Sequence, residues 1–165
     1  MAQETLTFPH LWDVLDEYGK RVRNLYQDNL IRADKIATGG LLNSVEFSVV
    51  QYGRRFDVVL TLADYWKWVE DGRKPGKMPP PSDILAWVLA KPVLPKPKAN
   101  GRIHTPQSLS WAIAKSIGKD GIDPTPALKQ ASDATFAEME RDIAAAFAQD
   151  VGENALLAFQ VFGRP

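Results

Sequence analysis

The segment around Glu70, Asp71 and Lys77 places carboxylates close to basic side chains, which is the arrangement in this sequence most compatible with catalysis. Two adjacent carboxylates can hold Mg²⁺ and a nearby lysine can contact phosphate, as a metal-dependent nuclease requires. The chain has no glycine-rich phosphate loop, no nucleophile motif, no cysteine and only two histidines. We therefore expect no enzyme activity, no catalytic residue, no cofactor and no metal site. A small nuclease that uses these three residues remains the alternative.

His10 and His104 are the two histidines, and each lies at or just before a predicted helix start. A catalytic histidine normally works with a nucleophile or a carboxylate partner, and the sequence places neither beside them. Metal-binding histidines are normally clustered with other ligands. We expect both side chains to be solvated or to cap a helix.

The middle of the chain is basic, although the whole sequence is neutral. Twenty basic and twenty acidic side chains cancel over the 165 residues. Residues 67–102 carry eight basic and three acidic side chains, a net charge of +5, which leaves −5 for the rest of the chain. A nucleic-acid-binding protein normally adds a recognition motif to such a basic region. A monomeric nucleic-acid-binding module is therefore the second alternative.

Two proline-rich segments, 72–81 and 91–104, are expected to contact another protein. A loop stiffened by proline loses less conformational entropy when it docks. The second segment has no apolar period that could pack it on its own domain, so we expect an extended arm there. The residues expected to form the interface are Trp66, Arg73, Lys74, Lys77, Pro92, Pro95, Lys96, Pro97, Lys98 and Arg102.

Three aromatic residues, Tyr65, Trp66 and Trp68, precede the first of these segments. On a helix, Trp68 shares a face with Tyr65 and Trp66 points elsewhere. One interpretation is that the cluster fills the core and covers the proline loop. The other is that part of it anchors a second protein, because tryptophan and tyrosine dominate interface hot spots.

A β-hairpin is predicted within residues 45–62, where apolar and polar residues alternate on both sides of Gly53. Glycine at the first position of a two-residue loop suits a tight turn. We therefore expect a positive φ at Gly53, and we expect Phe56, Val58 and Leu60 to be buried.

Helices are predicted on both sides of this hairpin. Apolar residues recur near the 3.6-residue period in a long first helix and a long last helix, and Ser82, Thr105 and Thr125 suit the starts of later helices. The apolar segment 155–162 is expected to be a final strand that pairs with the hairpin. The predicted helices cover residues 10–38, 62–71, 82–89, 105–118 and 125–150.

These elements predict one α+β domain over residues 1–165, with the long N-terminal helix and the long C-terminal helix packed on the sheet. The predicted order is helix, antiparallel hairpin, three short helices, long helix and strand. No apolar run approaches the ~20 residues of a membrane span, and the first residues do not resemble a secretory signal. No membrane partner is expected.

Two patterns in this sequence resemble those of a phage family. One is the aromatic turn Y-x-x-x-V-E-x-G, followed by a loop that contains proline; the other is I-x-x-x-G-I-x-P-x-P-x-L. With the element order over about residues 10–162, they resemble the tail-component, or tail-completion, family of tailed bacteriophages. Segment 91–104 looks longer than the usual connection in that family. The matching residues are Tyr65, Val69, Glu70, Gly72, Ile117, Gly121, Ile122, Pro124, Pro126 and Leu128.

The resemblance implies a structural virion protein, made in the bacterial cytoplasm and located in the neck or tail. Members of that family form closed rings that join the head to the tail. The implied partners are other copies of this chain, the portal or its adaptor, and tail-tube or other neck proteins. Packaged double-stranded DNA would lie close to the ring, without sequence-specific contacts.

Overall fold

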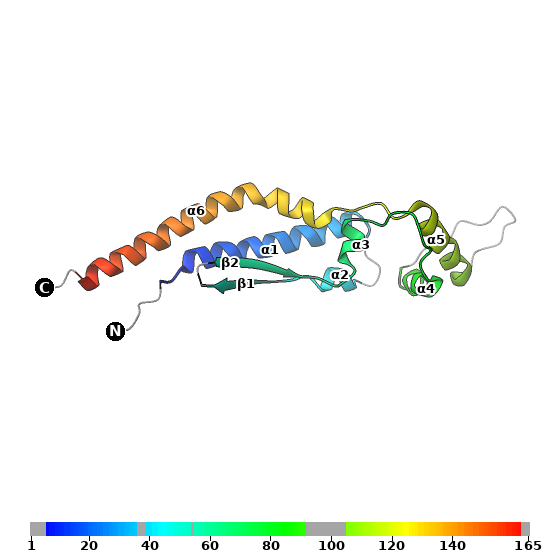
Figure 1. The fold of residues 1–165 in the computed structure, drawn as a ribbon, viewed down its shortest axis with the longest axis horizontal. Helices are drawn as coiled ribbons and strands as arrows, with labels where there is room; N and C mark the ends of the chain where they lie inside the picture. The colour runs from blue at the N-terminus through cyan, green and yellow to red at the C-terminus, as the bar shows by residue number, and fades with distance from the viewer. Residues whose placement is uncertain (1–5, 36–38, 54, 92–104, 163–165) are drawn as a thin grey trace.

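The computed structural model describes residues 6–35, 39–53, 55–91 and 105–162. The molecule is elongated: the two long helices lie side by side, a hairpin packs beside them, and a helical lobe lies at one end (Figure 1). The α+β class predicted from the sequence is confirmed. In chain order the elements are α1 (Pro9–Arg32), α2 (Gly40–Asn43), β1 (Glu46–Tyr52), β2 (Arg55–Thr61), α3 (Trp66–Glu70), α4 (Pro81–Ala90), α5 (Pro106–Asp120) and α6 (Ala127–Phe162).

Helix α1 buries one apolar stripe and ends at Arg32, earlier than the predicted Thr38. Asp34 adopts a left-handed conformation with φ of 51°, and the amide of Lys35 donates to the carbonyl of Leu30 at 3.0 Å. This Schellman-type ending satisfies the last carbonyls of the helix. A short side chain that tolerates positive φ therefore stops the helix before the predicted end at Thr38.

The hairpin forms as predicted, with β1 antiparallel to β2 and Gly53 at φ of 63°. Its sheet has only these two strands among the residues that the structure describes. Phe56, Val58 and Leu60 are half-buried and not fully buried as expected. A two-stranded sheet covers its residues less completely than a larger sheet, which accounts for their partial exposure.

The final strand predicted over residues 155–162 is wrong, because α6 continues as one helix to Phe162. A short apolar run does not by itself distinguish a strand from a helix. The segment is rich in alanine and leucine, which favour helix, and Gly152 costs only about 1 kcal/mol inside one. The helix therefore extends past the predicted end near Asp150.

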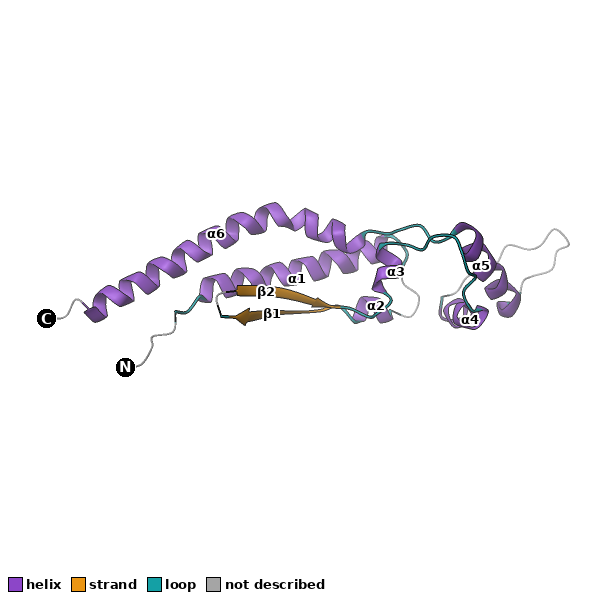
Figure 2. Cartoon of the chain, viewed as in Figure 1, coloured by secondary structure: helices purple, strands orange, loops and turns teal. Residues whose placement is uncertain are grey.

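The core lies where α1 packs antiparallel to α6, next to the start of the hairpin (Figure 2). Alanines of α6 face larger side chains of α1, which allows a close approach of the two helices. The amide group of Asn29 donates to the carbonyl of Ala127 at 3.0 Å and joins the end of α1 to the start of α6. The buried core residues are Val22, Tyr26, Leu30, Leu41, Val45, Ala127 and Ala131.

Both long helices begin at a carboxylate that comes from another element. Asp150 of α6 accepts hydrogen bonds from the amides of His10 and Leu11 at 3.1 and 2.9 Å. Glu70 of α3 accepts hydrogen bonds from the amides of Leu128 and Lys129 at 2.9 and 2.8 Å. A carboxylate at a helix N-terminus satisfies free amides and opposes the positive end of the helix dipole.

The short helices differ from the prediction at several ends. The predicted helix 62–71 forms only over Trp66–Glu70. Helix α4 begins at Pro81, so Ser82 is not its N-cap. Thr105 caps α5 as predicted, but the helix runs past the predicted end at 118 and stops at Gly121, where φ is 81°. No described helix combines the length and apolar character that crossing a membrane would require.

Candidate functional site

The two sequence patterns that carry the family resemblance meet in space, at the junction between the helical body and the α4–α5 lobe. The amide of Arg73 donates to the carbonyl of Ile122 at 2.9 Å, and the amide of Ile122 donates back to Arg73 at 2.8 Å. The amide of Thr125 donates to the carbonyl of Val69 at 2.9 Å. Two crossing segments of chain therefore connect body and lobe (Figure 2).

Two glycines allow the crossing segments to approach this closely. Gly72 has φ of 69°, and a Cβ there would lie 2.3 Å from the carbonyl oxygen of Ile122. Gly121 has φ of 81°, and a Cβ there would lie 2.2 Å from the carbonyl oxygen of Arg73. Any other residue would be strained and would collide with the opposite backbone. The glycines of both patterns thus have a structural role.

Glu70 and Asp71, the acidic pair of the nuclease alternative, do not line a common pocket in the described part of the chain. Both carboxylate oxygens of Glu70 accept amide hydrogens at the start of α6. Asp71 is exposed and lines a shallow pocket of about 320 Å³, in which Glu70 is not a lining residue. Lys77 is exposed on the loop that follows. Glu70 therefore acts as a helix cap, and the geometry adds no support for a shared Mg²⁺ site.

The aromatic turn divides between core and surface. Trp66 is half-buried and packs against the core cluster, with the amine of Lys67 5.9 Å from its ring centre. Trp68 is 59% exposed, and Tyr65 is exposed as well. Of the two tryptophans in α3, the structure therefore presents Trp68 to solvent, whereas the sequence reasoning named Trp66 as the anchor.

The basic residues of the predicted interface have different environments. Arg73 takes part in the junction, and its guanidinium donates to the carbonyl of Lys77 at 2.5 Å. Lys74 and Lys77 are exposed on the same loop. The remaining predicted interface residues lie outside the described part of the chain: Pro92, Pro95, Lys96, Pro97, Lys98 and Arg102.

The α4–α5 lobe exposes large apolar side chains at one end of the molecule, including Trp87, Leu89 and Trp111. Lys91 follows α4, and its amine pairs with the carboxylate of Asp34 at 2.6 Å. Trp87 also lines a mostly apolar groove of about 390 Å³ between α4 and the body.

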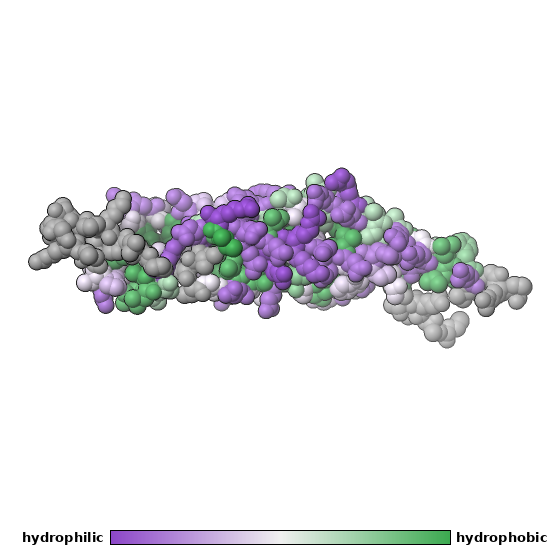
Figure 3. All heavy atoms as spheres, turned by 180° about the vertical axis from the view of Figure 1, so that it is seen from behind, coloured by the Kyte–Doolittle hydropathy of each residue, from purple (hydrophilic) through white to green (hydrophobic). Residues whose placement is uncertain are grey.

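The opposite end of the molecule carries a second apolar surface. The last residues of α6 extend past the start of α1 (Figure 1). Beyond Asn154, which donates to the carbonyl of Thr7 at 2.8 Å, eight further residues continue the helix over about 12 Å. Leu156, Leu157 and Phe159 are exposed there, Phe159 by 76%. Hydrophobic patches are visible toward both ends of the face in Figure 3.

Sequence reasoning did not identify Asp150 and Glu153, which the fold brings next to His10. A signal for Asp150 was present. It lies four residues after the buried Ala146 and continues the buried stripe of α6, where an unpaired carboxylate would be costly. Such a residue predicts a distant partner, although the sequence does not say which one.

Comparisons of the chain with protein-family models, with curated protein sequences and with solved structures find no match.

Proposed function

We propose that this chain is a structural, non-enzymatic component of a tailed-bacteriophage virion. In this proposal it assembles with copies of itself into a closed ring in the neck or tail-completion region and joins the portal or its adaptor to the tail. The observation that carries the proposal is the exposure of large apolar side chains at both ends of an elongated molecule. One end is the terminus of α6 and the other is the α4–α5 lobe.

Exposed apolar side chains that gather at two separate surfaces favour repeated contacts between copies. Single apolar residues on a surface are ordinary, whereas contiguous patches mark sites of association. A contact between two different surfaces of the same chain is heterologous, and it closes into a ring when the rotation between copies permits. Phe159 at one end, and Trp87 and Trp111 at the other, are residue types that suit the centre of such contacts.

Charge would orient these contacts more than strengthen them. The middle of α6 presents exposed carboxylates, including Glu138 and Glu140, whereas the loop between α3 and α4 presents Lys74 and Lys77. Exposed ion pairs contribute only about 0–1 kcal/mol each. Complementary charge nevertheless steers association and selects one orientation. The same basic loop can face an acidic neighbour or the packaged DNA.

The resemblance to tail-completion proteins supports the same proposal. Both of its patterns lie in the junction, where they cap α6, permit close backbone contact and connect the lobe to the body. These roles are structural and need no chemical reaction. The proposed partners besides further copies are the portal or adaptor and tail-tube or other neck proteins, as the resemblance implies.

The test compares two substitutions in α6. Leu156→Glu places a charge in the proposed contact, and Ala137→Glu places the same charge on an exposed position in the middle of the same helix. We expect Leu156→Glu to raise the dissociation constant of the oligomer at least tenfold. We also expect it to reduce the number of particles in which head and tail are joined. Ala137→Glu is expected to change both by less than about threefold.

Light scattering and native mass spectrometry measure the mass of the oligomer. Electron microscopy of particles that carry each variant measures the fraction of joined particles. Circular dichroism establishes that both variants remain folded. Equal assembly by the two variants would remove the α6 end from the contact. A chain that is monomeric alone and also inside purified particles would contradict the ring itself.

A further inference from the structure

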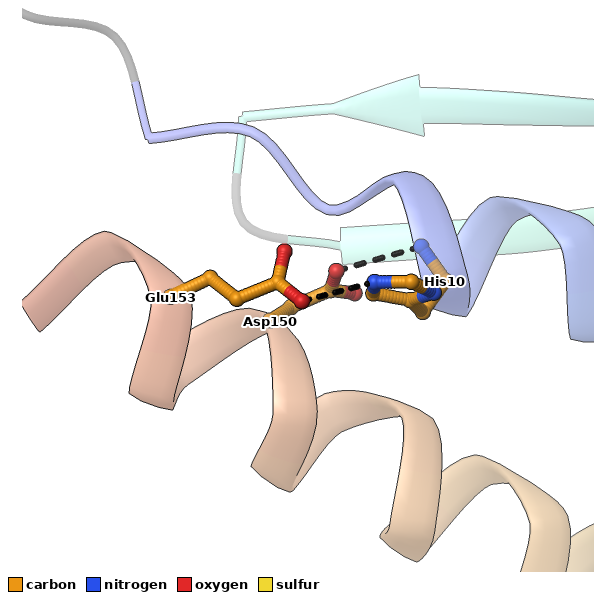
Figure 4. A group of neighbouring side chains, drawn as sticks. All are labelled: His10, Asp150 and Glu153. Atoms are coloured by element: carbon orange, nitrogen blue, oxygen red, sulfur yellow. Dashed lines mark hydrogen bonds and ion pairs between the residues drawn. The ribbon is translucent and has the colours of Figure 1, made fainter. Parts of the chain in front are cut away.

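His10, Asp150 and Glu153 form a cluster where the start of α1 meets α6 (Figure 4). Nε2 of His10 lies 3.1 Å from Oε1 of Glu153. One nitrogen or oxygen atom from each of the three side chains lies within 4.8 Å of the other two. We propose that these side chains bind one divalent first-row transition metal ion, with Zn²⁺ as the preferred ion. This site is independent of the assembly role proposed above.

Nε2 of His10 and Oε1 of Glu153 lie close enough to share either a proton or a metal ion. An imidazole nitrogen without a proton carries a lone pair, and a carboxylate oxygen only accepts. The amide nitrogen of Gln149 lies 3.0 Å from the same Nε2 atom of His10 and 3.2 Å from Oε1 of Glu153. Nε2 cannot accept from Gln149 and donate to Glu153 at the same time. A metal ion takes a lone pair from both atoms and leaves Gln149 to donate to Glu153.

Asp150 is held in position for a ligand role. Its side chain is only 1% exposed, and its two oxygens accept the amides of His10 and Leu11. Each carboxylate oxygen has two lone pairs, so each retains one for a metal ion. Hydrogen bonds of this kind orient ligating carboxylates in metal sites. The buried carboxylate therefore needs little reorganisation before an ion arrives.

The donor set and its charge suit a zinc-like ion. Zn²⁺ binds imidazole nitrogen and carboxylate oxygen at about 2.0–2.2 Å, which places tetrahedral ligands about 3.3 Å apart. The 3.1 Å contact between His10 and Glu153 matches that spacing, and Asp150 must approach by at most about 1.5 Å. None of the ion pairs among the described residues joins Asp150 or Glu153 to a lysine or arginine.

A bound ion would connect the start of α1 to α6 just before the apolar end of α6. His10 and Glu153 are partly exposed, so solvent can reach the ion and complete its coordination. The two carboxylates outweigh the partial charge of about +0.5 at the start of α1. A divalent ion therefore neutralises a local excess of negative charge.

The experiment uses the untagged full-length chain after removal of metal with EDTA and dialysis. Zn²⁺ is titrated at pH 7.5 by isothermal calorimetry, and Co²⁺ is titrated with detection of its visible absorption. We expect one ion per chain and a rise in Tm of about 5–10 °C when free Zn²⁺ reaches a hundred times Kd.

Matched variants separate the site from general binding to carboxylates. Glu153→Gln and His10→Gln each remove one ligand and should weaken Zn²⁺ binding at least tenfold. Glu138→Gln makes the same chemical change elsewhere on α6, at a residue paired with Arg21, and should leave Kd unchanged. Asp150 is left intact because it also caps α1.

Two results would overturn the proposal. One is the lack of saturable binding up to 1 mM Zn²⁺, which would leave the cluster as a histidine–carboxylate ion pair that shares a proton. The other is equal Kd in Glu153→Gln, His10→Gln and Glu138→Gln, which would assign the binding to other carboxylates.

Discussion

At the scale of single residues, Tyr26 shows how packing and polar chemistry conflict in the core. It is the largest fully buried side chain among the described residues, and its hydroxyl has no hydrogen-bond partner among them. Burial raises the pKa of Tyr26 to about 12, and the nearby Glu70 and Tyr65 act in the same direction. The folded protein therefore keeps this phenol neutral and leaves a polar group unpaired, which costs free energy.

Tyr26→Phe is expected to leave the free energy of unfolding at pH 7 unchanged or to raise it by about 1 kcal/mol. The gain over wild type should increase at high pH. Tyrosine ionises near pH 10 in the unfolded chain, and Tyr26 ionises near pH 12 in the folded protein. The stability associated with neutral Tyr26 is therefore present below pH 10 and lost between pH 10 and 12, with about 1.4 kcal/mol lost at pH 11.

Urea unfolding at pH 7 and pH 11 measures this difference. Tyr52→Phe is the control, because it makes the same chemical change at an exposed position. If the two phenylalanine variants respond equally to pH, the assignment of the effect to burial of Tyr26 is wrong.

At the scale of elements, Gly19 sets how closely the hairpin packs on α1. A Cβ at this position would lie 2.3 Å from Cδ2 of Phe47 on β1. Glycine inside a helix costs about 1 kcal/mol relative to alanine. Glycine is nevertheless required here, because the ring of Phe47 occupies the space that a side chain would need. The glycine therefore provides room for packing between a helix and a strand.

We expect Gly19→Ala to destabilise the protein by about 1–3 kcal/mol, despite the better helix propensity of alanine. In a Phe47→Leu background the same change should cost clearly less, because the smaller side chain frees the space. A double-mutant cycle measured by urea unfolding gives the coupling. Gly152→Ala is the matched control, since a Cβ there meets nothing within 4 Å, and it should stabilise α6 by up to about 1 kcal/mol. Equal effects of the two alanine substitutions would contradict a packing role for Gly19.

At the scale of the whole molecule, the long body and the α4–α5 lobe have separate interiors. The body buries side chains toward both ends of the contact between α1 and α6, whereas α4 packs on α5 (Figure 2). Val88, Ser110 and Ala114 are the buried residues of these two lobe helices. Regions with little buried apolar surface open at lower free energy than the main core. The lobe is therefore the part of the molecule that can adjust most easily to a neighbour.

Hydrogen exchange measured by mass spectrometry should show faster exchange in α4 and α5 than in α1. Val88→Ala is expected to lower protection within the lobe by about 1–3 kcal/mol and to leave α1 nearly unchanged. Val22→Ala makes the same change in the body, where it should lower the protection of α1 and α6. If Val88→Ala accelerates exchange in α1 as much as in α5, body and lobe form one cooperative unit.

The amino-acid sequence by itself determined the features that depend on neighbouring residues. The apolar period predicted the long first helix, the alternation around Gly53 predicted the hairpin and its positive φ, and Thr105 predicted the start of α5. Each of these signals acts over a few residues, through backbone sterics, local hydrogen bonds or the burial of one face. Such signals are readable without knowledge of the rest of the fold.

Tertiary structure alone decided the features that depend on distant residues. It placed Glu70 at the start of α6 and Asp150 beside His10, and it paired Arg73 with Ile122. Partner choice at such separations depends on how the helices pack, which local patterns do not encode. The same holds for the end of α6. Its apolar residues are compatible with a strand, but the sheet has no third strand in the described part of the chain. Helix propensity instead continues the preceding turns of α6 without a new nucleation cost.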